Sequence, residues 1–259
     1  MFIDKIKVGS HQLTSYPFNL ELFKSPFELD TSAPVIIFLG ENGSGKSSLL
    51  KLIQAKLSLV EISIPFQDQK IKLNHTPLEL KKSFKKVSGY FFESLSFINY
   101  IDYIKHEIES SKKMIEEVDE TYKDKSDYAK MMAKSPYHKT IYELKNMYEH
   151  DLSTQSHGES YLDFFKSRMR DHQLYLLDEP ETPLSTQNQL VLTSMIMNQV
   201  SRGCQFMIAT HSPILAAIPN AIIYLIKDDQ FLKVAYEDVE SINLLKQFLN
   251  HREQFLKHL

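Results

Sequence analysis

The chain has 259 residues, of which 42% are hydrophobic and 24% charged, and its formal net charge is −3. These values are typical of a globular protein with one large domain or two small ones, and they exclude the strong positive excess of proteins that coat nucleic acid. Cys204 is the one cysteine, so an intramolecular disulfide is impossible and we expect a reducing, cytoplasmic compartment.

The sequence predicts no direct insertion into a membrane. Residues 214–226 form the longest apolar stretch, but Pro219 and Asn220 interrupt it and it is too short to cross a bilayer. The first ten residues have no apolar core of the secretory kind. If the protein serves a membrane process, we expect another chain to supply the membrane part.

The N-terminal part of the chain predicts strands around a glycine-rich loop. Residues 2–8 favour a strand, and the apolar run 34–39 is typical of a strand buried in a parallel sheet. Residues 88–97 predict a further strand. The glycine-rich loop leads into a helix with one apolar face, formed by Leu49, Leu50, Ile53 and Leu57.

The middle of the chain changes in composition. Residues 70–86 contain six lysines and one acidic residue, Glu79. From about 100 to 150 the sequence is charged and helical, with an interruption near Pro136, which predicts an inserted subdomain of two or more helices. At about 25 residues each, such helices would be roughly 37 Å long.

The C-terminal part alternates between strands and helices. This alternation indicates a mostly parallel sheet covered by helices. The expected elements are a strand at 173–181, a helix at 185–203 closed by Gly203, a strand at 204–212, a hairpin at 221–238 turning at Asp228 and Asp229, and a closing helix at 241–256.

The strongest motif is the glycine-rich loop "GENGSGKS", which fits the pattern G-x-x-x-x-G-K-[ST] between a strand and a helix. Glycines let successive backbone N–H groups point at phosphate oxygens, and the helix adds its positive N-terminal dipole. Lys46 is expected to reach the β- and γ-phosphates and Ser47 to bind Mg²⁺. The nucleotide-binding residues predicted here are Glu41, Asn42, Gly43, Ser44, Gly45, Lys46, Ser47 and Ser48.

Two further motifs follow apolar strands. In "LYLLDEPE" we expect Asp178 to hold the magnesium and Glu179 to accept a proton from the attacking water, although helix capping is an ordinary alternative use of such carboxylates. In "IATHSP", His211 stands where a parallel sheet presents its ligand-facing edge. His211 is expected to sense the γ-phosphate. The alternative is that its side chain only makes a hydrogen bond that stabilises the fold.

The phosphate loop, the polar loop "STQSHGES", "LLDEP" and "THS" stand in the order of the ABC-type ATPases. "QSHGES", "YLLDEPETPLS" and "ATHSPIL" closely resemble the small stand-alone members, which are relatives of SMC and DNA-repair ATPase heads. The resemblance implies one α/β domain over residues 1–259, a P-loop NTPase of ABC type. Its mostly parallel sheet has flanking helices, and a helical subdomain at about 100–155 stands between the Walker A and signature motifs.

The resemblance also implies an active site shared between two chains. Ser156 and Gly158 match the serine and second glycine of the S-G-G-Q-like signature, which in that family binds the γ-phosphate held by the other subunit. His157 replaces the first glycine and Glu159 the glutamine. A hydroxyl, a bare backbone and a helix starting near Glu159 form an anion site. ATP, Mg²⁺ and an ATP-dependent head-to-tail homodimer are therefore expected.

The chain departs from the family pattern in three places. Pro183, Leu184 and Ser185 stand where the family often has an "ALD" loop. The Q-loop glutamine is not evident, and Glu93 and Gln67 are the candidates for its position. Tyr16 and Phe18 are the candidates for stacking on the base.

Three biological uses of an ATPase stay open at this point. The first is nucleic-acid maintenance or defence against foreign DNA, where the lysines of 70–86 could contact phosphates. The second is a regulatory clamp on an unidentified soluble protein. The third, the energy subunit of a membrane transporter, is ranked last because no Q-loop is clear.

Overall fold

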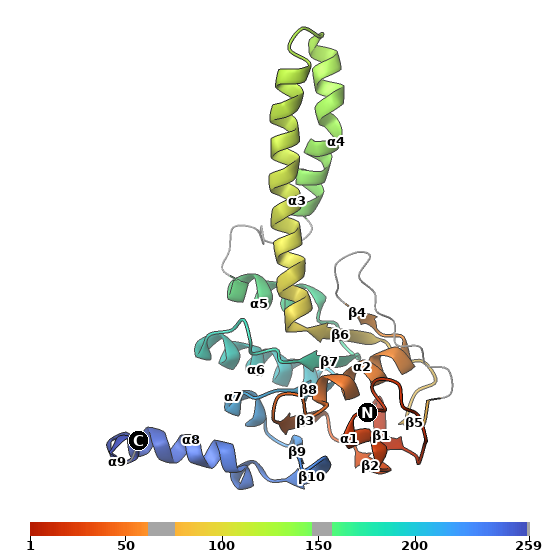
Figure 1. Ribbon diagram of the computed structural model, residues 1–259, viewed down its shortest axis with the longest axis vertical. Coiled ribbons are helices and arrows are strands. Elements are labelled where there is room, and N and C mark those ends of the chain that lie inside the picture. The colour runs from red at the N-terminus through yellow and green to blue at the C-terminus, as the bar shows by residue number, and fades with distance from the viewer. Residues whose placement is uncertain (62–75, 147–156, 258–259) are drawn as a thin grey trace. The chain divides into compact units, whose positions relative to one another are not determined.

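The computed structural model describes residues 1–61, 76–146 and 157–257, and within 157–160 only the backbone (Figure 1). The described chain divides into two compact units. We call residues 1–61, 76–93 and 170–257 the sheet unit, and residues 94–146 and 157–169 the helical unit.

The sheet unit is built around a seven-stranded sheet of order β10-β9-β3-β8-β7-β6-β4. Neighbouring strands are parallel except for β10, which is antiparallel to β9. The mostly parallel sheet predicted from the sequence is thus confirmed. The strands are β3 (Val35–Gly40), β4 (Val60–Glu61), β6 (Gly89–Glu93), β7 (Leu174–Asp178), β8 (Gln205–Ala209), β9 (Ile222–Lys227) and β10 (Gln230–Val234).

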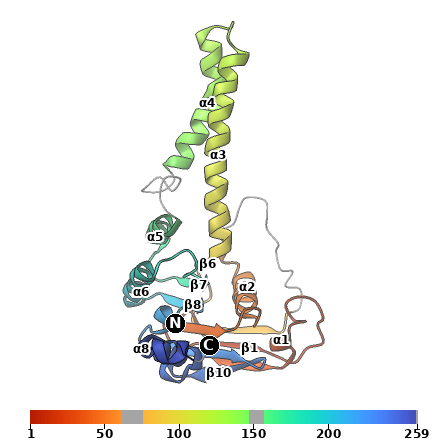
Figure 2. The ribbon, with the colours of Figure 1, turned by 60° about the vertical axis from the view of Figure 1, so that its left-hand side comes forward.

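Two long helices cover this sheet. α2 (Lys46–Leu57) follows β3, and α6 (Thr186–Ser201) connects β7 to β8. After β3 the chain crosses the sheet toward β4, and after β7 it crosses in the opposite direction toward β8. Because both crossovers are right-handed, α2 and α6 lie on opposite faces of the sheet (Figure 2). Their apolar faces and the central strands are buried, which explains why the apolar runs at 34–39, 173–181 and 204–212 were predicted correctly as strands.

A smaller antiparallel sheet, of order β2-β1-β5, completes the strands of this unit. β1 (Ile3–Val8) was predicted, whereas β2 (Phe27–Asp30) and β5 (Leu78–Lys82) were not. The buried Gln205 side chain joins the two sheets by accepting from the amides of Phe2 and Ile3, both at 2.9 Å, and donating to the carbonyls of Ile3 and Thr31 at 2.9 and 2.7 Å. A fully bonded buried amide of this kind fixes one alignment of the sheets.

The position of β5 changes the interpretation of the lysine stretch. Lys81 and Lys82 lie on an edge strand, where lysines block pairing with other chains. Glu79 pairs across the strands with Lys7. These lysines therefore have a structural explanation that needs no nucleic acid, while Lys70 and Lys72 lie outside the described residues.

The end of the chain follows the prediction with one difference. β9 and β10 form the expected hairpin, and Asp228 and Asp229 have positive φ values of 49° and 57°, as a two-residue turn between twisted strands requires. The expected helix at 241–256 is instead two helices, α8 (Glu240–Asn250) and α9 (Arg252–Leu256), with the break at His251. The short helices are α1 (Glu21–Lys24), α7 (Pro213–Ala216) and the 3-10 helix η1 (Tyr236–Asp238).

The helical unit consists of α3 (Ser94–Thr121), α4 (Asp127–Lys145) and α5 (His157–Arg168) among the described residues. α3 and α4 pack side by side (Figures 1 and 2), and Lys134 pairs with Asp119 at 2.5 Å between them. α3 has 28 residues, so it is about 42 Å long. No helix in the described part of the chain is long and apolar enough to cross a bilayer.

Two predictions about this region were wrong. The strand expected at 88–97 ends at Glu93, because the residues from Ser94 onward bury every third or fourth side chain and form α3. Pro136 was expected to interrupt the helices but lies inside α4. Proline in a helix interior costs about 3 kcal/mol, yet α4 continues through Pro136 while it packs against α3.

Candidate functional site

The glycine-rich loop connects β3 to α2, as its motif predicts. Gly43 and Gly45 have φ values of 80° and 96°, which favour glycine. A Cβ on Gly45 would come within 2.8 Å of the end of the Leu22 side chain, which would have to shift. The loop is thus held as a tight curve around the N-terminus of α2, where backbone amides can face an anion.

Lys46 folds over this loop. Its Nζ donates to the carbonyl oxygens of Gly40 and Glu41, both at 2.8 Å. Burial lowers the pKa of Lys46, while the charges of Glu179, Asp178 and Glu181 act in the opposite direction. A buried ammonium group held only by neutral carbonyls favours the arrival of an anion.

Ser44 offers a further donor in the same loop. Its Oγ is buried and has no hydrogen-bond partner among the described residues. A buried hydroxyl without a partner costs free energy, and a bound phosphate oxygen would accept its hydrogen bond. This unused donor fits the phosphate-binding role that the motif predicts for the loop.

Asp178 ends β7 beside the loop. Ser47 donates its hydroxyl to Oδ1 of Asp178 at 2.9 Å, joining two motifs that stand 131 residues apart. Asp178 is only 3% exposed, and burial raises its pKa to about 6. Hydroxyl and carboxylate oxygens are ligands that Mg²⁺ prefers, in sites completed by substrate phosphates and water. The described residues hold no cluster of three or more His, Cys, Asp or Glu side chains suited to a metal, so a magnesium ion here depends on such outside ligands.

The raised pKa of Asp178 predicts how stability depends on pH. Because the folded protein binds this proton more tightly than the unfolded chain, the stabilisation is complete below about pH 4 and is lost as pH rises through about 6. The change from the ordinary 3.8 to about 6 corresponds to about 3 kcal/mol. Without Mg²⁺, raising the pH from 4 to 7.5 should therefore lower the free energy of unfolding of the wild type by about this amount more than that of Asp178→Asn. Denaturant titrations between pH 4 and pH 7.5 in a chelator check this, and parallel curves for the two proteins would contradict it.

Glu179 and His211 lie together at the ends of adjacent strands. Glu179 has a φ of 47°, unusual for a residue other than glycine, and its amide donates to the carbonyl of Ala209 at 2.8 Å. The turn brings its Oε1 within 3.7 Å of Nε2 of His211. Both side chains are about 40% exposed, at 43% and 40%, so a water molecule or a phosphate can reach them.

Three charged residues of this site, Glu93, Lys51 and Glu181, were not assigned a firm role from the sequence. Glu93 ends β6 next to Asp178 in the sheet, and it pairs with Lys51 of α2 at 2.6 Å. Glu181 accepts from the backbone amide of His211 at 2.6 Å. Lys51 and Glu181 stand within five residues of Lys46 and Glu179, and that proximity is the only sequence signal that could have found them. Gln67, the other Q-loop candidate, lies outside the described residues.

The candidates for base stacking differ in exposure. Tyr16 is 54% exposed, and its hydroxyl lies 2.9 Å from Oγ of Ser48 in the first turn of α2. Phe18 is 4% exposed and packs against Phe23 and His11. The prediction for Phe18 is therefore wrong, because its ring is already covered by the core, and Tyr16 stays the candidate.

The signature loop belongs to a different part of the chain. Gly158 is the second residue of α5 in the helical unit, so this helix begins two residues before the expected start near Glu159. Ser156 lies outside the described residues. Farther along, Ser185 caps α6 by accepting from the amide of Asn188 at 3.3 Å, which gives the residues at 183–185 a structural role.

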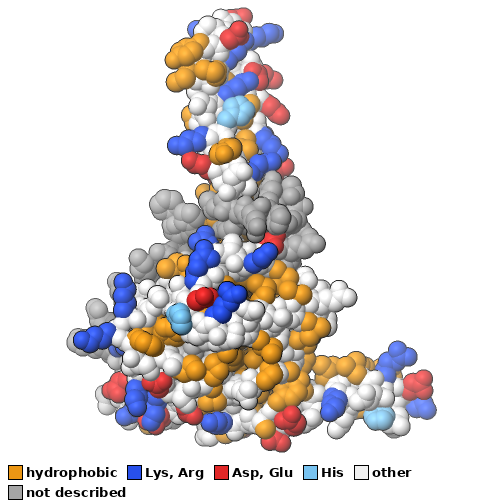
Figure 3. Space-filling model, turned by 180° about the vertical axis from the view of Figure 1, so that it is seen from behind, with side chains coloured by type: hydrophobic (Ala, Val, Ile, Leu, Met, Phe, Trp, Pro, Cys, Tyr) orange, Lys and Arg blue, Asp and Glu red, His pale blue; other side chains and the backbone are white. Residues whose placement is uncertain are grey.

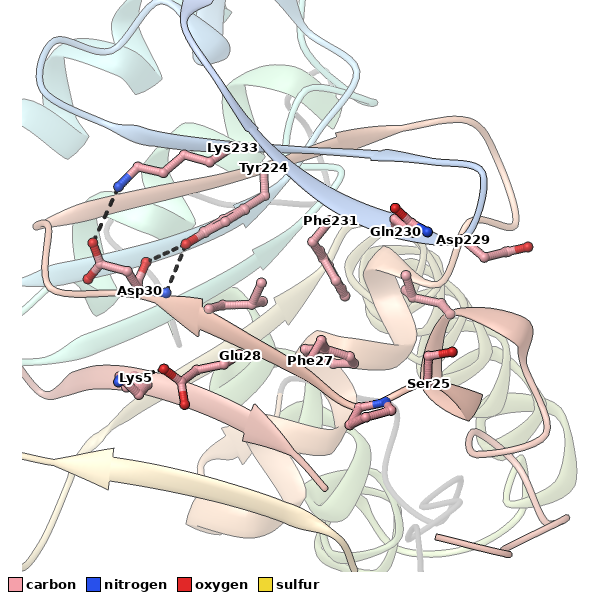
Figure 4. A pocket seen from close by; sticks show the side chains of 13 residues that line it. Lys5, Ser25, Phe27, Glu28, Asp30, Tyr224, Asp229, Gln230, Phe231 and Lys233 are labelled. Carbon is pink, nitrogen blue, oxygen red and sulfur yellow. Dashed lines mark hydrogen bonds and ion pairs between the residues drawn. The ribbon is translucent and has the colours of Figure 1, made fainter. Parts of the chain in front are cut away.

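A separate hollow of about 690 Å³ lies between β2 and the β9–β10 hairpin (Figure 4). Phe27 and Phe231 meet inside it with ring centroids 4.7 Å apart. Four of its charged residues form two ion pairs, since Lys5 bonds Glu28 at 2.6 Å and Lys233 bonds Asp30 at 3.3 Å. None of the residues assigned to phosphate or metal binding lines this hollow.

Comparison with known proteins identifies the family. Residues 27–182, more than half of the chain, match the family described as ABC transporter. A protein of Methanocaldococcus jannaschii named as an ABC transporter ATP-binding protein is 23% identical over 234 residues, which cover 87% of this chain and 75% of that protein.

Two solved structures align with the chain at low sequence identity. The SMC head domain from Thermotoga maritima aligns with a TM-score of 0.47 at 14% identity, covering 91% of this chain and 100% of that one. A nucleotide-free ATP-binding cassette from an ABC transporter aligns with a TM-score of 0.48 at 14% identity, covering 94% and 96%. Since both scores are below 0.5, the assignment rests on the match over residues 27–182: the chain belongs to the ABC transporter family and is an ATP-binding, ATP-hydrolysing domain of that family.

Proposed function

We propose that the chain hydrolyses Mg-ATP in a head-to-tail homodimer and that ATP-driven closure of this dimer is its mechanical output. One observation carries the proposal. The carboxyl edge of the seven-stranded sheet gathers a phosphate loop, a magnesium-binding pair and a carboxylate beside a histidine, contributed by Lys46, Ser47, Asp178, Glu179 and His211.

Phosphate binding begins with an exchange of partners at Lys46. In the free protein its ammonium group bonds two carbonyls of the loop, and the β- and γ-phosphates of ATP offer it stronger, charged acceptors. Ser44 adds its unused hydroxyl, and the amides of the loop add their N–H groups. Ser47 and Asp178 would hold Mg²⁺, which when bound neutralises charge on the phosphates.

Hydrolysis requires a general base, and it also requires a group that senses the γ-phosphate. Glu179 is partly exposed at the strand end, so it can accept a proton from a water that attacks the γ-phosphate. His211 lies against it and would donate to the γ-phosphate oxygens. The closeness of the two side chains supports coupling between proton transfer and phosphate sensing.

The second chain supplies the remaining contacts. Ser156 and Gly158 of the signature motif would bind the γ-phosphate held by Lys46 of the other copy. Closure would then depend on ATP, and hydrolysis would release it. The helical unit, which carries α5 and the long pair α3 and α4, would transmit this change to a partner.

For the partner, the comparisons favour a transporter component. The family and the Methanocaldococcus relative are both named for ABC transporters, which supports a membrane protein supplied by another chain. A soluble effector protein is the second candidate, because Tyr128, Met131 and Met132 are exposed on α4. Figure 3 shows hydrophobic side chains on the surface of this helix pair. A role in nucleic-acid maintenance or defence, expected first from the sequence, gains no support from the comparisons.

A capture experiment separates these partners. Glu179→Gln in Mg-ATP should accumulate in the closed state and retain any bound partner protein during purification. Lys46→Ala under the same conditions is the matched control. Enrichment of a membrane protein supports the first candidate and of a soluble protein the second. Stimulation of wild-type turnover by DNA would instead return the nucleic-acid role to first place.

ATP binding by Lys46→Ala tests the site itself. Because this side chain supplies the charge that meets the phosphates, we expect the affinity for ATP to fall at least tenfold, from the loss of a charge-assisted hydrogen bond. Calorimetry measures the affinity, and circular dichroism verifies the fold. Lys56→Ala, an exposed lysine in the last turn of the same helix, should bind as the wild type does. Undiminished binding by folded Lys46→Ala would place the nucleotide elsewhere.

A further inference from the structure

Glu181 is a charged residue for which the proposed catalytic steps give no role, and it contacts the candidate site directly. It stands two residues after Glu179, in the loop that leaves β7. Its Oε1 accepts a hydrogen bond from the backbone amide of His211 at 2.6 Å, across 30 residues of sequence. The same loop also places the Glu179 carboxylate 3.7 Å from the His211 ring. One loop thus contacts His211 at its backbone and at its side chain.

The second carboxylate oxygen of Glu181 lies in an energetically unfavourable position. Oε2 is buried and has no hydrogen-bond partner among the described residues. Such an arrangement costs free energy, and natural proteins keep it mostly where function requires it. The charge is also close enough to Lys46 to act on the pKa of that group, so Glu181 belongs to the same electrostatic environment as the phosphate loop.

We propose that Glu181 is a positioning residue for ATP hydrolysis, which holds the His211 backbone so that the His211 ring stays against Glu179. The inference rests on the proposed function, because it requires His211 and Glu179 to act on ATP. The side chain works through a single accepted hydrogen bond and does not touch the reacting atoms. Loss of that bond frees the amide of His211, and the ring then samples positions from which it cannot reach the γ-phosphate.

The surrounding contacts make the test practicable, because a second connection joins the same two loops. Gln189 of α6 accepts from the Ser212 hydroxyl at 2.7 Å and donates to the Leu184 carbonyl at 3.2 Å. Ser212 also caps α7 by accepting from two amides. The loops should therefore stay together without Glu181, so its removal alters the local placement of His211 rather than the fold.

The experiment compares Glu181→Ala with Glu181→Gln. Alanine removes the acceptor, and kcat should fall about tenfold or more while the KM for ATP stays within about twofold, since small displacements of a reacting group have effects of this size. Glutamine keeps an oxygen that accepts from His211, so its kcat should return to within about threefold of the wild type. Glu253→Gln, an exposed position in α9, is the control. If glutamine is as impaired as alanine, the charge matters rather than the hydrogen bond, and the proposal is overturned.

A double-mutant cycle connects the effect to His211. If Glu181 acts through His211, the double variant Glu181→Ala/His211→Ala should be no slower than His211→Ala alone, within about twofold. Multiplied losses would overturn the inference while leaving the proposed function in place, provided that Glu179→Gln and His211→Ala are each impaired. Full activity of His211→Ala would also overturn the inference, because the histidine would then have no role for Glu181 to support, whereas the proposed hydrolysis itself is tested by Glu179→Gln.

Discussion

Glu179→Gln should bind Mg-ATP with nearly the affinity of the wild type but hydrolyse it at least about 10²-fold more slowly, the usual contribution of a general base. Glutamine has almost the same shape as glutamate and cannot accept a proton from water at neutral pH. The phosphate loop, with Lys46 and Ser44, is untouched. Steady-state phosphate release and single-turnover assays measure the loss, and calorimetry measures binding.

The same variant tests assembly. If closure requires ATP and reopening requires hydrolysis, Glu179→Gln should accumulate as a dimer in Mg-ATP and remain monomeric without nucleotide, as measured by light scattering. Glu253→Gln should behave as the wild type, because that side chain is exposed in α9 and lies outside the motifs. An unchanged turnover rate would assign the base to another residue, and a strict monomer in ATP would exclude the two-chain site.

Two inactive variants should regain activity when they are mixed. Ser156→Arg leaves the phosphate loop of its own chain intact, so it should bind ATP, but a large charged side chain in the signature loop should block closure. Lys46→Ala has the opposite defect, with an intact signature and a disabled phosphate loop. In a mixed dimer, one composite site carries both defects and the other carries neither.

The expected recovery follows from symmetry. Random pairing of equal amounts gives half mixed dimers, each with one intact site of two, so activity should reach at most about a quarter of the wild type. Differently tagged chains confirm exchange of subunits, and mixing Lys46→Ala with Glu179→Gln is the control. Those two defects both lie in the sheet unit. Each composite site of that control pair therefore keeps one defect, and no recovery is expected. Full hydrolysis by Ser156→Arg alone would mean that the loop around this residue is an ordinary turn that does not contact ATP.

Local patterns determined much of this protein from the sequence alone. The loop around Lys46, the strand that ends at Asp178 and the turn at Asp228 and Asp229 were predicted because each depends on backbone preferences and hydrophobic runs of a few residues. The motif order further identified the family, which the match over residues 27–182 bears out. Family membership in turn implied ATP hydrolysis, and this conclusion did not need the three-dimensional structure.

Other features became visible only in three dimensions. Pro136 lies inside a helix that packs against a neighbouring helix, and a local pattern cannot reveal that contact. Phe18 is covered by residues close to it in sequence but folded over it, so its exposure could not be judged from its residue type. β5 depends on pairing with β1, about 75 residues earlier, and its own lysine-rich sequence gives little strand signal.

The chemistry of the site divides in the same way. The sequence named Asp178, Glu179 and His211, whereas the order of strands decided that β8 lies between β3 and β7 and that Glu93 stands beside Asp178. The contact of Glu181 with the His211 amide depends on the positive φ at Glu179, which turns the chain after β7. Motifs specify which groups are present because chemistry selects residue types. Distances between those groups depend on long-range pairing and packing, and these are set by the whole fold.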